Sequence, residues 1–206
     1  MVDFSIIRHV PSRGGLKTRG GSLAASTLGA KLAALVALIV PGAVPLGAAT
    51  ALPDVADLAA KCENSSGSVG ADMRISACSQ LLAAAANMTT LQRAKVFTNR
   101  AWAYGQNRSW TLAQQDYDAA IGLTPDWAIA HNDRAFAYLR EGRIDLALRS
   151  YDRALQIDPK TVYALYGRGV ARLRLKQSDS GTADLTAARR MMPNVDQVFA
   201  LYGMAP

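Results

Sequence analysis

Two cysteines carry the clearest chemical signal in this 206-residue sequence. Cys62 and Cys78 are separated by a turn-rich loop, Glu63 to Gly70, and flanked by two alanine-rich stretches, 54–62 and 71–86, that we expect to be helical. A helical hairpin would bring the two thiols together, so we predict a disulfide, whose loop closure is worth about 3 kcal/mol. Two buried free thiols are the alternative. No histidine follows either cysteine at ligand spacing, and we expect neither a metal nor another cofactor.

The other groups that could act as acids, bases or nucleophiles form no catalytic motif. The sequence contains no Gly-x-Ser-x-Gly segment, phosphate-binding loop or dinucleotide fingerprint. His131 shares a column of the repeat described below with Phe97 and Leu165, which are packing residues, so we interpret it as a core or boundary histidine. We therefore predict no enzymatic activity. Matches to the glycosylation sequon begin at Asn64, Asn87 and Asn107.

The composition indicates a folded chain whose positive charge is concentrated at one end. Hydrophobic residues make up 50% and charged residues 19%, which excludes wholesale disorder. The net charge is +7, but residues 1–31 hold five basic residues and one acidic residue, which leaves 18 basic and 15 acidic residues elsewhere. This nearly balanced remainder offers little electrostatic basis for binding phosphates, so we expect no nucleic-acid partner.

The first part of the chain has the order of an export signal. A basic stretch precedes an uncharged apolar run, Leu32 to Ala49, which ends in small residues. We predict that residues 1–49 are a secretory signal peptide, cut after Ala49 or Ala51. The alternative is an uncleaved N-terminal anchor, although the run is short for a membrane span and contains two prolines. Export and the paired cysteines together favour the bacterial periplasm, with a membrane-anchored form facing the periplasm as the alternative.

A 34-residue period organises the rest of the sequence. Matching residues recur at this spacing without a gap between residues 94 and 195. Such regularity is the signature of a repeat architecture. The columns include Pro125, Pro159 and Pro193; Ala120, Ala154 and Ala188; Ala113, Ala147 and Gly181; Ala101, Ala135 and Gly169; Tyr117, Tyr151 and Leu185; and Arg100, Arg134 and Arg168.

Each repeat contains two helical patterns. In the middle unit these run over about 128–141 and 144–157, separated at Gly142, which can take the left-handed conformation that ends a helix. We expect Asp158 to cap the next helix with Pro159 at its first position, and Thr124-Pro125 to do the same one unit earlier. Thr89 and Gln92 predict a capping box at the start of the first repeat.

These columns of small residues, tyrosines and prolines resemble the tetratricopeptide repeat family over residues 94–193. The third unit departs from the pattern, because Arg172 stands where tyrosine is usual and Gly181 and Leu185 replace alanine and tyrosine. The resemblance implies an all-α fold, a right-handed α-solenoid of stacked antiparallel helix pairs. We divide the chain into the signal, a degenerate disulfide-linked hairpin over 50–91, and a repeat array over 92–206 whose last helix, in 195–203, is a cap.

The resemblance also implies a concave groove lined by the first helix of each unit. Trp102, Phe136 and Val170 form an apolar column along it, and we expect Trp102, Phe136 and Tyr166 to anchor a ligand. The predicted groove residues are Lys95, Thr98, Asn99, Trp102, Gln106, Ile129, Asn132, Asp133, Phe136, Arg140, Tyr163, Tyr166, Val170 and Arg174. The cations and asparagines of the family's carboxylate-binding clamp are missing, which argues against that ligand.

These features predict a non-catalytic scaffold that binds a peptide or helix of an envelope protein in the groove. The alternative is a membrane-anchored structural subunit that self-associates through its flanks, and a groove filled by residues 195–206 would favour it. In this interpretation the chain touches a membrane only through an uncleaved N-terminal segment. The column of Arg100, Arg134 and Arg168 is expected to be structural, paired with aspartates of neighbouring helices.

Overall fold

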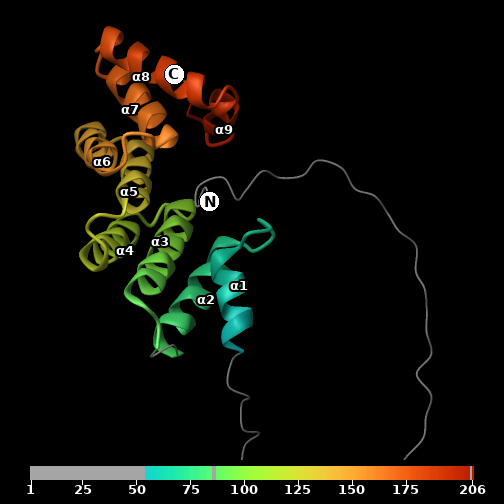
Figure 1. Cartoon of the computed structure of the whole chain (residues 1–206). Coiled ribbons are helices and arrows are strands. Elements are labelled where there is room, and N and C mark those ends of the chain that lie inside the picture. Colours follow the sequence, from blue (N-terminus) through green and yellow to red (C-terminus); the bar gives the residue numbers. More distant parts are fainter. Residues whose placement is uncertain (1–53, 85–86, 205) are drawn as a thin grey trace, which may run out of the picture. The chain divides into compact units, whose positions relative to one another are not determined.

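The fold was analysed in a computed structural model that describes residues 54–84, 87–204 and 206. The described residues form only helices and connecting turns, and all of them belong to one compact unit (Figure 1). The predicted signal or anchor, residues 1–49, lies outside the described residues. Within them, no helix combines the length and apolarity needed to span a membrane. The helices are α1 (Val55–Glu63), α2 (Ala71–Ala84), α3 (Thr90–Gln106), α4 (Trp110–Leu123), α5 (Ala128–Glu141), α6 (Ile144–Ile157), α7 (Val162–Arg174), α8 (Ser178–Met191) and α9 (Val195–Ala200).

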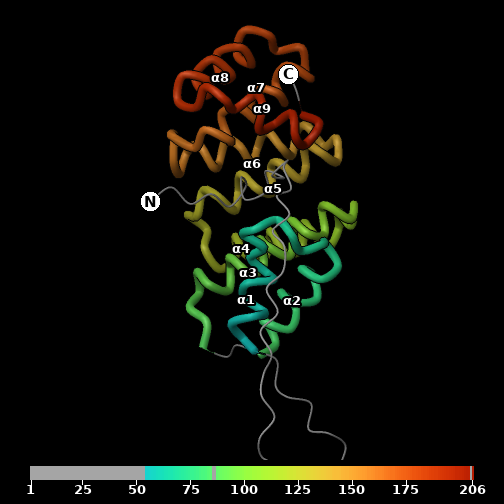
Figure 2. Tube along the Cα trace, turned by 90° about the vertical axis from the view of Figure 1, so that its right-hand side faces the viewer, coloured from blue at the N-terminus to red at the C-terminus, as the bar shows by residue number. Residues whose placement is uncertain are grey.

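The helices pack as consecutive hairpins. The pairs α1–α2, α3–α4, α5–α6 and α7–α8 each form a close contact, and every pair also packs on the next (Figures 1 and 2). The first helices of the repeats, α3, α5 and α7, contact one another in turn, which places them side by side. Each hairpin buries an apolar face that it could not cover alone. The predicted all-α solenoid of stacked helix pairs is therefore confirmed.

Small residues allow the helices of each hairpin to approach closely. Ala135 and Ala147, the predicted crossing point of the middle unit, are both fully buried. In the third unit the equivalent residues are Gly169 and Gly181, and a Cβ atom added to either would lie 3.0 Å from the carbonyl oxygen of the other. The backbones of α7 and α8 therefore touch at this point. Leu185, in place of a tyrosine, packs over Gly169 in this narrower space.

The boundaries of the middle unit are as predicted, and Gly142 ends α5 with a φ of 86°. The capping box between Thr89 and Gln92 is also present, with both reciprocal hydrogen bonds formed. The expected caps at Thr124-Pro125 and Asp158-Pro159 are wrong. Each of these dipeptides lies before the next helix in a separate turn, and α7 begins only at Val162. The Asp158 carboxylate instead accepts from the Lys160 amide two residues on, which closes a local turn.

The disulfide-linked hairpin at the start of the described chain packs on the first repeat. Cys62 and Cys78 form the predicted disulfide, and both are buried. The buried Arg74 donates from Nε to the carbonyl oxygen of Cys62 at 2.8 Å and from Nη2 to Asn99 Oδ1 of α3 at 3.0 Å. It thereby joins α1, α2 and α3 through one side chain. Asn64, the first sequon residue, is also buried and bonds through its amide to both backbone groups of Val69, so this sequon is not accessible in the fold.

Candidate protein-binding site

The first helices of the repeats share an aromatic and aliphatic surface, which we call the A-helix face. It consists of Trp102 on α3, Phe136 on α5, and Tyr166 and Val170 on α7. The rings of Trp102 and Phe136 lie 5.2 Å apart between centroids, so the surface is continuous from one repeat to the next. These residues recur at the 34-residue period or lie one helical turn from it, which explains how repeat stacking builds the surface.

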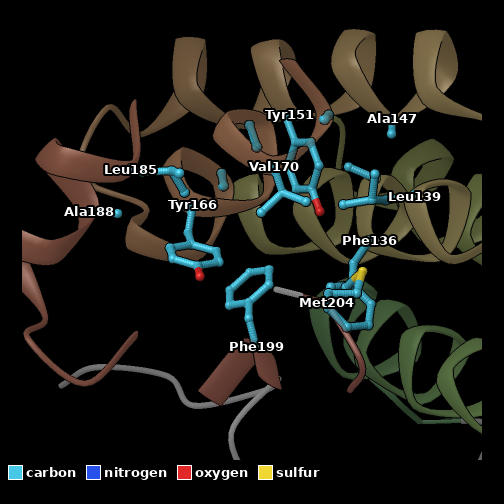
Figure 3. Close-up of a cluster of buried hydrophobic side chains, with 14 of the residues drawn as sticks. Phe136, Leu139, Ala147, Tyr151, Tyr166, Val170, Leu185, Ala188, Phe199 and Met204 are labelled. Carbon is cyan, nitrogen blue, oxygen red and sulfur yellow. The ribbon is translucent and has the colours of Figure 1, made fainter. Parts of the chain in front are cut away.

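A segment of the chain itself covers this face. We call residues 195–204, which comprise α9 and the turn after it, the α9 segment. Phe199 lies between Tyr166 and Phe136, with ring centroids 4.2 Å and 5.9 Å away (Figure 3). Tyr202 meets Trp102 and Phe136 edge-on at 5.6 Å and 5.5 Å. The segment therefore contacts the aromatic residue of all three repeats.

A polar contact accompanies these apolar ones at the start of the α9 segment. The Tyr166 hydroxyl donates to Asp196 at 2.7 Å, and the Arg189 guanidinium donates to the two oxygens of the same carboxylate at 2.7 Å and 2.8 Å. These hydrogen bonds, with that from Arg189 the stronger, lower the pKa of Asp196 to about 2. Burial and the bond to the carboxylate raise the pKa of Tyr166. The carboxylate thus remains ionised at neutral pH and holds the start of the α9 segment on α7 and α8.

The predicted groove residues fall into three groups by burial. Those in and below the aromatic column are buried: Thr98, Asn132, Asp133, Phe136, Tyr166 and Val170. Those at its margin are half-buried: Asn99, Trp102, Ile129 and Tyr163. Those exposed to solvent are Lys95, Gln106, Arg140 and Arg174. The fold therefore brings the predicted residues onto adjoining helices, but α9 leaves mainly the polar members accessible.

A polar layer lies beneath the aromatic column. Asp133 is buried and accepts a hydrogen bond from Asn132 at 3.1 Å. Burial, and then the charge of Asp133, raise the pKa of the fully buried Tyr117 and Tyr151. Both phenols therefore remain neutral and act as packing groups. The Tyr151 hydroxyl occupies the space where a Cβ atom of residue 167 would lie, and it has no hydrogen-bond partner among the described residues.

The repeat pattern does not identify the individual residues that cover the face. Asp196, Phe199, Tyr202 and Met204 lie after the last full repeat, so the 34-residue period gives them no role. The spacing of Phe199 and Tyr202, three residues apart after Pro193, is the signal that could have identified an apolar helical turn. Its docking position depends on the turn at Gly203, where φ is 69°, and this turn directs Met204 back into the core.

The predicted pairing of the arginine column is confirmed. Arg100 binds Asp116 through two hydrogen bonds of 2.7 Å and 2.8 Å, and Arg134 pairs with Asp118 at 2.6 Å. Arg168 pairs with aspartates on both neighbouring second helices, Asp184 and Asp152, at 2.8 Å. Arg172, the departure from the family pattern, also contacts Asp184 at 2.8 Å. These cations therefore join successive helices and do not form a free basic stripe.

His131 is a core residue, as predicted. It is buried, and its Nε2 donates to the carbonyl oxygen of Pro125 at 2.9 Å, so Nδ1 is the unprotonated nitrogen. Nδ1 has no hydrogen-bond partner among the described residues. Burial lowers the pKa of His131, and the nearby Arg134 and Arg153 add to this effect. The neutral imidazole therefore closes the turn before α5.

Comparisons with known proteins agree with the repeat architecture. A family model described as a TPR repeat matches residues 137–176. A crystal structure of MamA is 16% identical with a TM-score of 0.57, covering 70% of this chain and 81% of that chain. The Arabidopsis OM64 TPR domain is 26% identical with a TM-score of 0.51, covering 54% of this chain and 93% of that domain. No curated protein matches the chain. Residues 137–176 thus match a tetratricopeptide repeat, and the stacked helix pairs of the chain resemble those of solved tetratricopeptide repeat structures.

Proposed function

We propose that this chain is a scaffold that binds a short helical segment of another protein on its A-helix face. Tetratricopeptide repeats are typically non-catalytic interaction modules, and the match of residues 137–176 to such a repeat supports a protein partner in general. The observation that carries the finer proposal is that the face already holds a helical segment, α9, through aromatic side chains. A surface that accommodates such a segment within the chain has the shape and chemistry to bind a similar one from a partner.

The anchors of the proposed site are Trp102, Phe136 and Tyr166. Aromatic side chains supply a large contact area with few rotatable bonds, and such residues dominate many interfaces. They project from packed helices, so little conformational freedom is lost on binding. The exposed margin carries Arg140 and Arg174, which favours a partner with acidic residues beside its apolar ones.

The partner is proposed to be an exported protein. The basic and apolar N-terminal stretch supports a secretory signal, and the disulfide between Cys62 and Cys78 suits an oxidising compartment. The bacterial periplasm is such a compartment. An uncleaved N-terminal segment would instead hold the chain at the membrane with its repeats in the same compartment.

A second candidate function is that of a structural subunit in an envelope assembly. The observation that favours it is that the α9 segment covers the aromatic column, which is the arrangement expected if the face has only an internal role. Contacts with other proteins would then use the flanks, where Val55, Met73 and Leu201 are exposed.

Site-specific photocrosslinking separates the two candidates. A photoreactive residue replaces Gln106, which follows Trp102 by one helical turn, and a matched control replaces Gln156, which is exposed on α6. In cells that produce the full chain at its native level, we expect a discrete adduct with a partner at position 106 and none at 156. An adduct only from position 156, or only between copies of the chain, would favour the structural subunit.

A further inference from the structure

We infer that the α9 segment is a built-in competitor for the A-helix face, and that the partner segment recognised there carries two aromatic residues three positions apart, followed by an apolar residue. This inference rests on the proposed function and specifies its ligand. The pattern is that of Phe199, Tyr202 and Met204 in the covering segment. The occupant of the face is thus proposed to be a partner helix with this pattern, bound after α9 has been released.

The reach of the α9 segment exceeds what capping requires. A cap needs to cover only the exposed end of the last repeat, α7 and α8. Phe199 does this at Tyr166, but Tyr202 continues along the face to Phe136 and Trp102, in the second and first repeats. Met204, two residues farther on, is only 2% exposed (Figure 3). The segment therefore occupies the face as a ligand of the whole array would.

The backbone of the segment makes its hydrogen bonds locally. Among the described residues, the backbone bonds of 195–204 connect to residues within 192–204, including those from the amides of Tyr202 and Met204 to the Phe199 carbonyl. The segment thus keeps its own turn and contacts α3, α5 and α7 through side chains. Its release breaks no backbone pairing with the repeats, and a separate peptide could reproduce the same contacts.

Covalent attachment explains how the segment could limit binding. A tethered ligand acts at an effective concentration on the order of millimolar for a short linker, so a free partner competes at a disadvantage. A change that weakens the internal contact should lower the apparent dissociation constant of a partner by the same factor. The face is then regulated by the strength of the α9 contact.

The test uses a fluorescent peptide with the sequence of residues 194–204 as the probe. Its dissociation constant is measured by anisotropy with the full wild-type chain, with a Phe199→Ala/Tyr202→Ala chain, and with Leu201→Ala, whose side chain points to solvent and is 54% exposed. We expect the double variant to bind at least about tenfold more tightly than wild type, and Leu201→Ala to match wild type. A peptide with alanine in place of both aromatic residues should not bind.

A second variant guards against loss of folding. Asp196→Ala removes the polar contact to Tyr166 and Arg189 while leaving every aromatic residue in place. It should also bind the probe more tightly than wild type, and adding Trp102→Ala to it should weaken that binding. Equal affinity of the wild-type, double-variant and Asp196→Ala chains for the probe would overturn the inference.

The two proposals fail in different ways. If the probe does not bind the Phe199→Ala/Tyr202→Ala and Asp196→Ala variants but position 106 still yields a partner adduct, the scaffold function stands and the inference is wrong. If the probe binds these two variants but position 106 yields no partner adduct, α9 does compete for the A-helix face and the scaffold function is wrong.

Discussion

The Tyr166 hydroxyl donates a 2.7 Å hydrogen bond to Asp196, and this bond connects the third repeat to the segment that covers it. Tyr166 is fully buried, whereas the Asp196 side chain is 41% exposed, so the bond lies at the edge of the core. It is strengthened by Arg189, which binds the same carboxylate. The Asp196 carboxylate therefore helps to hold the covering segment on the third repeat.

Acid should loosen the α9 segment between pH 4 and pH 2. The pKa of Asp196 is lowered to about 2 in the fold, below its ordinary value of 3.8. A lowered carboxyl pKa stabilises the covered state above pH 4, and this contribution is lost as the pH falls from 4 through 2. The protection factors of the amides in 195–204, which correct for the intrinsic pH dependence of hydrogen exchange, should fall in that window. Asp196→Asn should abolish this change in protection between pH 4 and pH 2. If the change persists in the variant, another titrating group causes it.

Adding a methyl group at Gly167 should destabilise the fold. A Cβ atom there would overlap the ring and hydroxyl of Tyr151, which is enclosed by the core. We expect Gly167→Ala to cost about 1–3 kcal/mol in the free energy of unfolding, as overpacking does. Urea unfolding measures this cost.

Removing the Tyr151 hydroxyl should not lower the free energy of unfolding. The hydroxyl is buried without a hydrogen-bond partner among the described residues, so Tyr151→Phe should be neutral or stabilising by up to about 1 kcal/mol. Combined with Gly167→Ala, Tyr151→Phe should restore part of the unfolding free energy that Gly167→Ala removes. Strict additivity of the two changes would show that the hydroxyl of Tyr151 does not contribute to the clash.

The three repeat arginines should differ in their contribution to stability. Arg168 contacts two aspartates, of which Asp184 is nearly buried, so Arg168→Met should cost about 2–3 kcal/mol. Arg134 pairs with Asp118, which is 59% exposed, so Arg134→Met should cost less than about 1 kcal/mol. Methionine retains the apolar stem as a control for packing. Equal costs in thermal or urea unfolding would contradict the assigned pairs.

His131 should make stability fall in mildly acidic solution. Burial lowers the pKa of His131, so the unfolded chain binds a proton more readily than the fold does. This contribution is present in full above about pH 6.5 and declines as the pH falls below that value. Leu165 occupies the equivalent position of the next repeat, which makes His131→Leu a matched change. The variant should show a flatter dependence of unfolding free energy between pH 7 and 5.

Reduction of the disulfide should affect the first hairpin more than the repeats. The bond between Cys62 and Cys78 closes the loop between α1 and α2, and such closure contributes about 3 kcal/mol. After replacement of both cysteines by serine, amides of α1 and α2 should exchange faster, whereas those of α5–α8 should change little. Loss of protection throughout the chain would show that the hairpin is required for the whole array.

The sequence alone determined the features that depend on local or periodic order. The 34-residue spacing predicted the helix pairs and the arginine–aspartate pairs, because each depends on neighbours within a hairpin or one repeat away. Local patterns predicted the left-handed glycine at 142, the capping box at Thr89 and the disulfide. The turns at the prolines were misjudged, because a side chain such as Asp158 can close a turn after one helix as readily as it can cap the next.

Only the tertiary structure decided what covers the A-helix face. Trp102 and Tyr202 are 100 positions apart and share no periodic relation, so no pattern in the sequence connects them. Their contact requires stacking of the three repeats, the early end of α9 at Ala200 and the turn at Gly203. The repeat spacing could predict an aromatic surface, because local patterns build it, whereas its occupant was settled by the sum of distant apolar contacts in the folded chain.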